Sequence, residues 1–231
     1  SVVDFTLGEP DFPTPPHVVE AAARAMRAGE TRYTASNGTL ALREAIAAKF
    51  ARENAITAGP AEIVVGAGAK QIIDVALAAT LDAGDEVIVP APYWVSYPDL
   101  VRAHGGTPVV VSTDPADGFR LRPDALASAI TARTKWIVLN TPNNPSGAVL
   151  SAGELGALAT VIERHPHVFV LTDEIYEHFV FASPRPPSIA ALAPELAART
   201  LTVNGVSKAY AMPGWRIGYA AWPAPLVAAM S

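Results

Sequence analysis

Short runs of apolar, often β-branched residues alternate along most of the chain with segments in which apolar residues recur every three or four positions. The apolar runs are continuous and end at Gly, Pro, Asn or Asp, as is typical of strands buried on both faces of a sheet. These predicted strands are residues 62–66, 86–90, 107–112, 135–140, 168–172 and 200–204. The periodic segments between them, residues 69–81, 122–132 and 151–165, predict helices.

The regular alternation of strand and helix predicts an α/β fold, with a mostly parallel sheet sandwiched by helices. Ligands of such folds bind at the carboxyl ends of the strands. Upstream, residues 17–28 and 40–54 predict two further helices, which are joined by a polar turn. Residues 223–231 begin like another helix, with a proline in its first turn.

Composition narrows the class of protein. Of the 231 residues, 50% are apolar and 17% are charged, so we expect a folded domain with a sizeable core. The net charge of -5 and the lack of any basic run argue against nucleic-acid binding. No cysteine is present, and no apolar stretch is long enough to span a bilayer, so we expect a cytoplasmic protein without membrane contact. Because the chain opens without Met and stops early in a helical pattern, we expect it to come from the interior of a longer protein.

A Gly-rich turn follows the first predicted strand and leads directly into a helix. The free backbone N–H groups of Ala69 and Lys70 at such a helix start suit a phosphate. Gln71 stands where a dinucleotide-binding fingerprint needs a third small residue, which argues against a nicotinamide-dependent oxidoreductase. A tight turn without a ligand explains this segment equally well.

The last three predicted strands are each followed by polar side chains, which are, in chain order, Asn144, then Asp173 with Tyr176, then Lys208 with Arg216. The first two positions have ordinary alternatives, because "TPNNPSG" can form a simple Pro or Asx turn and an acid after a strand can cap a helix. Since the carboxyl ends of parallel strands meet at one edge of a sheet, we expect the five side chains to lie together.

Lys208 lies among Gly, Ala and Ser residues in "NGVSKAYAMPGWRIGY". Desolvation in so apolar a loop lowers the pKa of a lysine and makes its amine a nucleophile toward carbonyl groups. The neighbouring groups suit one partner, pyridoxal 5'-phosphate (PLP), which has a ring nitrogen, a phenolic oxygen and a phosphate. Asp173 suits the ring nitrogen, and Asn144 and Tyr176 suit the phenolic oxygen. Ser207 and Arg216 suit the phosphate.

The motifs "TLGEPDFPTP", "PYWVSYP", "TPNNPSGAV", "TDEIYEH" and "NGVSKAYAMPGWRIGY" resemble, in order and spacing, the signatures of the class I aminotransferases of PLP fold type I. Among these, the chain resembles most closely the bacterial aspartate aminotransferase subgroup that includes aspartate/prephenate enzymes. The resemblance implies a large PLP-binding domain over residues 37–231, preceded by an N-terminal, substrate-side segment over residues 1–36. The family's C-terminal small domain, with its arginine for the substrate α-carboxylate, has no counterpart in these residues.

The resemblance also implies a role for each matching position. Lys208 matches the lysine that forms a Schiff base with the cofactor and then moves the proton at the substrate Cα. Asp173 matches the aspartate that keeps the pyridine nitrogen protonated, and Tyr176 and Asn144 match the residues that bind the ring oxygen. Trp94 matches the aromatic residue stacked on the ring. The resemblance implies no metal ligand.

The same resemblance implies that Ser207, Arg216 and the backbone amides of Ala69 and Lys70 bind the cofactor phosphate. Tyr33 matches a tyrosine that reaches the phosphate of the neighbouring subunit, which implies a homodimer with shared sites. The matching residues on the substrate side are Gly8, Trp94, Asn144 and Lys70.

The implied function is a PLP-dependent aminotransferase, which moves an amino group between an amino acid and a 2-oxo acid by ping-pong half-reactions. Lys70 matches a lysine that meets the distal carboxylate of aspartate or glutamate, although a solvated lysine at a helix start is the plain alternative. Two other functions stay open. Aminotransferases for aromatic or neutral amino acids and C–S lyases share the fold. A PLP-binding sensor domain of a transcription regulator is also possible, but it would carry a basic winged-helix segment upstream.

Overall fold

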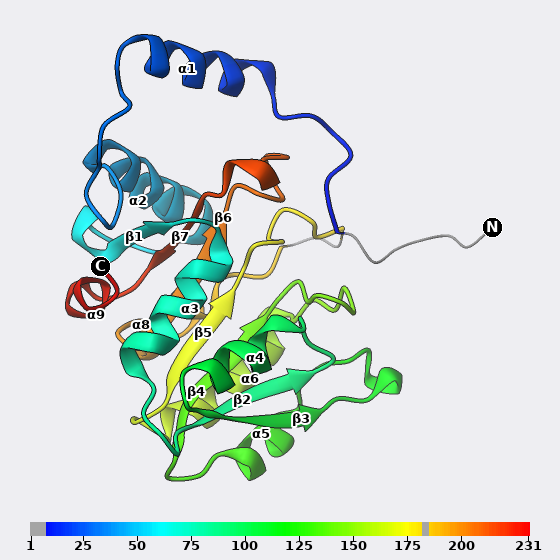
Figure 1. Ribbon diagram of the computed structural model, residues 1–231. Coiled ribbons are helices and arrows are strands. Elements are labelled where there is room, and N and C mark those ends of the chain that lie inside the picture. The colour runs from blue at the N-terminus through cyan, green and yellow to red at the C-terminus, as the bar shows by residue number, and fades with distance from the viewer. Residues whose placement is uncertain (1–7, 182–184) are drawn as a thin grey trace.

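A computed structural model describes residues 8–181 and 185–231 of the chain (Figure 1). These residues form a 7-stranded sheet with the order β1-β7-β6-β5-β4-β2-β3. The strands are β1 (Ile63–Gly66), β2 (Glu86–Ala91), β3 (Thr107–Ser112), β4 (Thr134–Asn140), β5 (Phe169–Asp173), β6 (Thr200–Gly205) and β7 (Gly218–Ala221). The pairs from β3 through β2, β4 and β5 to β6 are parallel, and β7 runs antiparallel to both β6 and β1. The predicted mostly parallel sheet is therefore confirmed.

The helices of the described chain are α1 (Pro16–Arg27), α2 (Leu40–Asn54), α3 (Ala69–Thr80), α4 (Ser96–Ala103), α5 (Pro123–Ala129), α6 (Ala152–Glu163), α7 (Ile189–Leu192), α8 (Pro194–Ala197) and α9 (Ala224–Ala229). All of them except α1 pack against the sheet or its edge. Helices α3, α4 and α9 pack on one face, and α5, α6, α7 and α8 pack on the other. Successive side chains of one strand point to opposite faces of the sheet: Trp136 packs with α3, whereas Ile137 packs with α6. This explains why the strand sequences are continuously apolar.

Several predicted boundaries shift for local reasons. β1 begins at Ile63 because Pro60–Glu62 form a 3-10 turn. The predicted helix 122–132 ends earlier, at Ala129, because the Thr134 side chain accepts from the backbone N–H of Thr131 in a turn before β4. Helix α6 begins as predicted, at a capping box in which Ser151 and Glu154 satisfy each other's backbone N–H groups.

Four elements were not predicted from the sequence: the four-residue helices α7 and α8, and two elements that bear on the cleft, β7 and α4. β7 has only four residues, Gly-Tyr-Ala-Ala, and none of them is β-branched, so they give no strand pattern. α4 lies within "PYWVSYPDLVRA", where Pro98 in the first turn hides the helical period. Both elements matter, because β7 extends the sheet beyond β6 and α4 begins beside the cleft described below.

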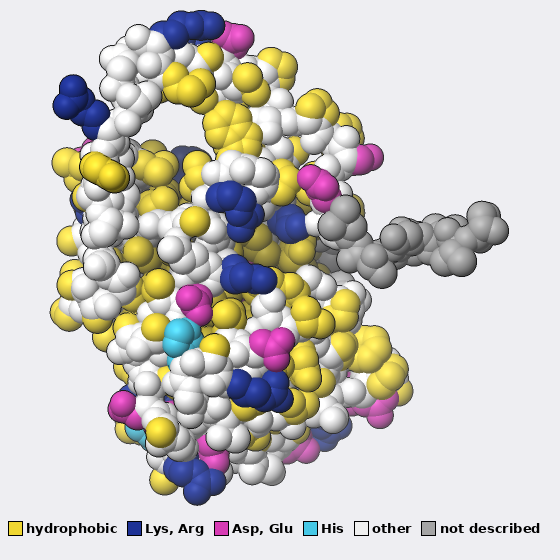
Figure 2. Space-filling model, in the orientation of Figure 1, with side chains coloured by type: hydrophobic (Ala, Val, Ile, Leu, Met, Phe, Trp, Pro, Cys, Tyr) yellow, Lys and Arg dark blue, Asp and Glu magenta, His cyan; other side chains and the backbone are white. Residues whose placement is uncertain are grey.

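Helix α1 stands apart from the rest of the molecule and arches over an open gap (Figures 1 and 2). None of its residues is buried, although its apolar side chains gather on one side of the helix. Among the described residues, no helix combines the length and the hydropathy that crossing a membrane requires.

Candidate active site

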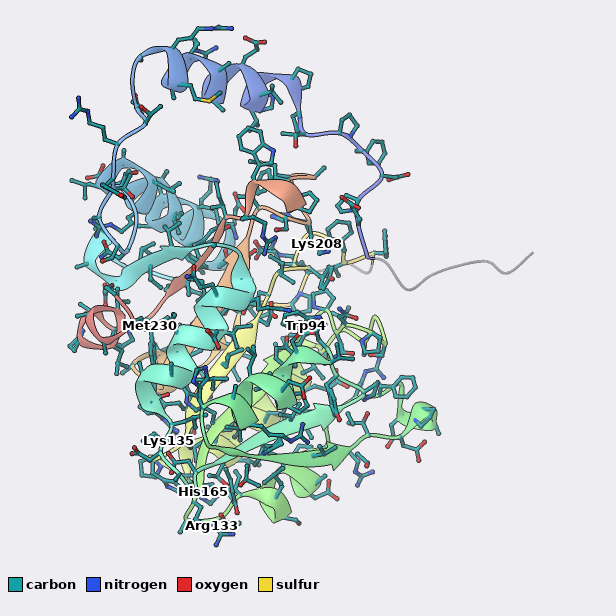
Figure 3. The ribbon with its side chains drawn as sticks, viewed as in Figure 1. Trp94, Arg133, Lys135, His165, Lys208 and Met230 are labelled. Carbon is teal, nitrogen blue, oxygen red and sulfur yellow. The ribbon has the colours of Figure 1, made fainter. Side chains whose placement is uncertain are left out.

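A cleft of about 460 Å³, open to solvent, lies at the carboxyl ends of the parallel strands. It brings together ten of the residues expected from the sequence: Gly8, Ala69, Lys70, Trp94, Asn144, Asp173, Tyr176, Ser207, Lys208 and Arg216. Figure 3 shows Trp94 and Lys208 at this end of the sheet, with Arg133, Lys135 and His165 at the opposite end. Segments more than 100 residues apart thus contribute to one site, as the carboxyl-end argument predicted.

Asp173, the last residue of β5, places a buried carboxylate in this cleft. Its Oδ2 accepts a hydrogen bond from the Tyr97 hydroxyl at 2.7 Å, and its Oδ1 accepts from the backbone N–H of Ile175 at 3.2 Å. Burial raises the pKa of Asp173, and these two hydrogen bonds oppose that rise. The carboxylate is therefore held in one orientation by two donors that favour its charged form.

Sequence reasoning missed Tyr97, although it lies in the quoted motif "PYWVSYP". It stands three residues after Trp94, in the first turn of α4, and its ring lies edge-on to the Trp94 ring at 5.3 Å between centroids. Burial and the adjacent Asp173 raise the pKa of Tyr97 well above its usual range, so the hydroxyl keeps its proton and donates. Its spacing from Trp94 was the only signal available.

Asn140 is a second residue that sequence reasoning missed. It is the last residue of β4, and its side-chain N–H donates to the backbone carbonyl of Asp173 at 3.0 Å. Its side-chain oxygen accepts from the backbone N–H of Asn144 at 2.8 Å. Asn140 therefore joins the ends of β4 and β5 and holds the loop that places the Asn144 side chain at the cleft.

Tyr176 and Lys208 face each other across the cleft, with the Lys208 Nζ 5.9 Å from the centre of the Tyr176 ring. Burial raises the pKa of Tyr176, the charge of Asp173 adds to this, and a hydrogen bond from the side chain of Asn144 opposes it. Burial also lowers the pKa of Lys208, with Arg216 adding to this effect and Glu9 opposing it. The predicted desolvation of Lys208 is thus confirmed in direction.

The amine of Lys208 also donates to the backbone carbonyl of Gly8. The N-terminal segment continues along the same loop, where the Thr14 hydroxyl donates to the carbonyl of Ala211 at 2.9 Å. The Trp215 ring N–H donates in turn to the Thr14 hydroxyl at 3.0 Å. These contacts place Gly8 beside Lys208, at the position expected for the substrate side.

Arg216 adopts a left-handed backbone conformation, with φ of 55°, and its Nη1 donates to the carbonyl of Pro213 at 2.9 Å. Gly68, which precedes α3, also has positive φ, and a Cβ there would lie 2.3 Å from the Arg216 Nη2. A glycine is therefore required for Arg216 to lie over the start of α3. The amides of Ala69 and Lys70 open this 12-residue helix, so a cation and a helix N-terminus face the same space.

Lys70 lies at the cleft rather than away from it. Its Nζ is 4.9 Å from the centre of the Trp94 ring, which is a cation–π geometry. Lys70, Lys208 and Arg216 therefore bring three positive charges to the lining, against the single carboxylate of Asp173. Among the described residues, none of the three cations forms an ion pair, so the cleft is suited to an anionic ligand.

Tyr33 lies outside the cleft, in the connection between α1 and α2, and its side chain is fully exposed. The described chain therefore does not bring Tyr33 to its own site. Its role at the phosphate of a neighbouring subunit stays a prediction.

Glu174 lies next to Asp173, but its carboxylate is directed away from the cleft and is buried against Ser188 and Thr172, which donate to it at 2.6 and 3.1 Å. Burial raises the pKa of Glu174 from 4.5 to about 7, the charge of Glu177 adds to this rise, and the Ser188 hydrogen bond opposes it. The folded protein thus binds a proton at Glu174 up to about pH 7, whereas the unfolded chain releases it near pH 4.5. The resulting stability is fully present below pH 4.5 and is lost as the pH rises through about 7.

Glu174→Gln is expected to gain stability relative to the wild type, by up to about 3 kcal/mol, as the pH rises from 4.5 to 8. Urea unfolding at several pH values measures this difference. Glu86→Gln serves as the control, because hydrogen bonds from Thr131 and Arg133 lower the pKa of Glu86. A difference between Glu174→Gln and the wild type that stays constant with pH would show that Glu174 is not titrating in this range.

The sheet order defines an α/β protein with a cleft at the carboxyl ends of its parallel strands, and the charged residues that line this cleft are three cations and one carboxylate. The family model for aminotransferase class I and II matches residues 1–231. The chain therefore belongs to the class I and II aminotransferase family, as the motifs predicted.

Individual relatives agree with this assignment. The chain is 53% identical, over 99% of its length and 57% of the relative's, to the aspartate/prephenate aminotransferase of Cereibacter sphaeroides. The crystal structure of the aspartate aminotransferase from Rhizobium meliloti superposes with a TM-score of 0.95 at 54% identity, covering 97% of this chain and 56% of that one. For the aspartate aminotransferase of Thermus thermophilus with maleate, the TM-score is 0.93 at 49% identity, covering 97% and 58%.

The chain thus spans little more than half the length of these relatives. Their names do not favour the alternatives of a C–S lyase, a sensor domain or an oxidoreductase.

Proposed function

We propose that this chain is the cofactor-binding part of a PLP-dependent aminotransferase that takes aspartate or glutamate as amino donor and a 2-oxo acid as acceptor, by ping-pong half-reactions. The observation that carries the proposal is the pairing, in one cleft, of the buried Asp173 carboxylate with the partly desolvated Lys208 amine. Family membership and the names of the relatives support it.

The residues present fit PLP. Because Gly68 has no side chain, the Arg216 guanidinium lies over the start of α3, where it suits a phosphate together with Ser207 and the first amides of α3. Two donors orient the Asp173 carboxylate and favour its charged form, and a carboxylate beside a ring nitrogen raises the pKa of that nitrogen. When bound, PLP supplies an electron sink for the carbanion that forms at the substrate Cα.

The remaining groups orient the cofactor and move the proton. Tyr176, whose raised pKa keeps its hydroxyl protonated, and the amide of Asn144 would bind the ring oxygen, while Trp94 would cover one face of the ring. Lys208, with its lowered pKa, offers a larger neutral fraction of amine than an exposed lysine does. With PLP bound, that amine would serve as the nucleophile toward the carbonyl carbon of the cofactor and as the base toward the proton on the substrate Cα.

Lys70 is the proposed determinant of the dicarboxylic substrate. Its ammonium lies at the cleft without an ion pair to a described residue and is held over the Trp94 ring, so it is available to a distal carboxylate. The Thermus thermophilus relative is described with maleate, which is a dicarboxylate.

Lys70→Met is expected to raise the KM for aspartate about tenfold, because one charge-assisted contact is lost, and to leave the kinetics with alanine within about twofold. Steady-state assays with the two amino donors measure this change. Lys135→Met, at the opposite end of the sheet, is the matched control. Equal losses with aspartate and alanine would argue against a contact with the distal carboxylate.

The proposal includes a homodimer. Helix α1 buries none of its residues, and Val19 and Met26 on it are 44% and 62% exposed. An apolar helix surface of this kind, next to the fully exposed Tyr33, suits contact with a second copy. In that arrangement Tyr33 would reach the phosphate site of the neighbouring subunit, and each site would draw on both copies.

Residues 37–231 form the PLP-binding domain in this proposal, with residues 1–36 as the substrate-side segment, and the enzyme is cytoplasmic. The test, on the complete protein that contains this chain, is an absorbance spectrum with PLP before and after borohydride, followed by turnover with aspartate and 2-oxoglutarate. A visible band that borohydride removes, together with turnover, is the expected result. A band without turnover would favour the sensor domain, and no band would contradict the proposal.

A further inference from the structure

The loop that follows β5 divides its side chains between two environments. Asp173 and Tyr176 line the cleft, whereas Glu174 and Glu177 are buried on the other side of the loop. There they meet Lys49 and Asn54, near the end of α2, which are also buried. We call Lys49, Asn54, Glu174 and Glu177 the anchor network.

Asn54 links the two glutamates. Its side-chain N–H group donates to Glu174 at 3.3 Å and to Glu177, and its side-chain oxygen accepts from the Lys49 ammonium at 2.8 Å. Lys49 also donates to Glu177, so this carboxylate receives an amide and a cation from the same helix. Each polar group of Asn54 is therefore used, and more than 100 residues of sequence separate the helix from the loop.

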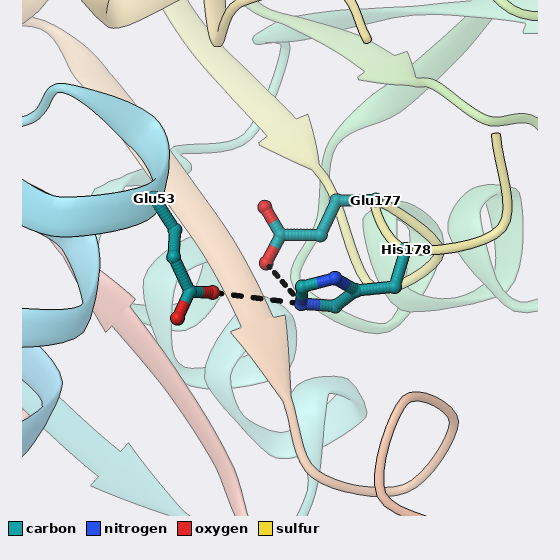
Figure 4. Close-up of side chains that lie close together, drawn as sticks. All are labelled: Glu53, Glu177 and His178. Carbon is teal, nitrogen blue, oxygen red and sulfur yellow. Dashed lines mark ion pairs between the residues drawn. The ribbon is translucent and has the colours of Figure 1, made fainter. Parts of the chain in front are cut away.

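Figure 4 shows Glu177 beside Glu53 of α2 and His178, and the nearest side-chain atoms of the three residues lie within 4.8 Å of one another. The His178 Nε2 is 3.4 Å from Glu177 and 3.6 Å from Glu53. The Lys49 ammonium contacts Glu177 and is 3.6 Å from Glu53, so both carboxylates already face a cation. This cluster is therefore the outer part of an ion-pair network, and it does not carry a metal-site assignment.

The spacing of the loop has a mechanical consequence. Glu174 and Glu177 are three residues apart, as are Asp173 and Tyr176, so holding the first pair fixes the backbone that carries the second pair. Buried hydrogen-bonded charges are rigid, because moving one of them leaves its partner unsatisfied in a medium of low dielectric constant. The backbone N–H of Glu174 also donates to the Val203 carbonyl at 2.9 Å, which ties the loop to β6.

We propose that the anchor network is a positioning device for the cofactor groups: Lys49 and Asn54 hold Glu174 and Glu177 from behind, so that Asp173 and Tyr176 are fixed at the cleft. The inference rests on the proposed function, because it assigns these side chains a role in binding PLP. None of the four network residues lines the cleft, so they act through Asp173 and Tyr176.

The test compares Glu177→Gln with Glu86→Gln. Both residues are buried glutamates paired with a cation, but Glu86 pairs with Arg133 at the end of the sheet opposite the cleft. In the protein without PLP, Glu177→Gln is expected to speed hydrogen exchange of the amides of residues 174–178 about tenfold, whereas Glu86→Gln leaves them unchanged. In a PLP titration, Glu177→Gln is expected to weaken binding about tenfold, and Glu86→Gln to stay within about twofold of the wild type.

Lys49→Met breaks the same contact from the α2 side and is expected to give the same two changes, which keeps the test open if Glu177→Gln does not fold. Faster exchange with unchanged PLP affinity, or unchanged exchange, would overturn the positioning role while leaving the proposed function intact. A wild-type protein that binds no PLP would overturn the proposed function and this inference with it. Equal weakening by the Glu86→Gln control would also overturn the inference, since the effect would then be general destabilisation.

Discussion

Lys208→Ala is expected to remove the visible absorption band of the protein with PLP and to lower kcat by about 10⁴-fold or more, because the residue supplies both the nucleophile and the proton carrier. Its amine is the only described lysine nitrogen in the cleft apart from that of Lys70, which lies over the Trp94 ring. Spectra before and after borohydride, together with single-turnover assays, measure the two effects.

The matched control is Lys135→Ala, a lysine at the opposite end of the sheet, which should keep both the band and the turnover. A wild-type-like band in Lys208→Ala would mean that another amine binds the cofactor. Loss of the band with unfolding of the protein would be recognised by thermal melting without PLP. Lys208 is only half-buried and forms no ion pair with an acid of the described residues, so its replacement by alanine should lower the free energy of unfolding little.

Asp173→Asn is expected to lower kcat by about 10² to 10³-fold, since the charge that stabilises a protonated ring nitrogen is lost while the shape of the side chain is kept. The unloaded variant should be at least as stable as the wild type, because burial disfavours the carboxylate charge, as the raised pKa of Asp173 shows. Turnover assays and urea unfolding without PLP measure the two properties on the same protein.

Asp74→Asn is the control, since Asp74 lies on α3 and pairs with His104 outside the cleft. Large losses of both activity and stability in Asp173→Asn would indicate a structural role for the charge rather than an effect on the cofactor. Normal activity would contradict the assignment of Asp173 to the ring nitrogen.

The strands and the cleft were predictable because they depend on local pattern. Continuous apolar runs require burial on both faces, and parallel strands place the residues that follow them at one edge. This argument predicts that Asn144, Asp173, Tyr176, Lys208 and Arg216 lie close together, and all five line the observed cleft. The roles of single residues came from the family resemblance, and the assays above test them.

The roles of Tyr97 and Asn140 could not be predicted from the sequence, because each depends on a hydrogen bond to Asp173, which is distant in the sequence. Tyr97 reaches Asp173 from a helix 76 residues earlier, and Asn140 reaches the backbone of Asp173 from the neighbouring strand. An asparagine at a strand end and a tyrosine in a helix have many ordinary uses, so neither residue type signals such a contact. β7 was not predicted for a related reason, since its four residues, Gly-Tyr-Ala-Ala, form a strand by pairing with β1 and β6.

The sequence by itself determined the layers of the fold, the edge of the sheet at which the cleft lies, and the family, because each depends on residue types at fixed spacings. Only the tertiary structure decided which of two adjacent acids serves the cleft. In "TDEIYEH", Asp173 and Glu174 have the same local character. Contacts from distant segments separate them: Tyr97 holds Asp173 at the cleft, while Asn54 and Ser188 hold Glu174 behind the loop. Burial and charge, and with them the pKa of each group, depend on neighbours that folding brings from elsewhere in the chain.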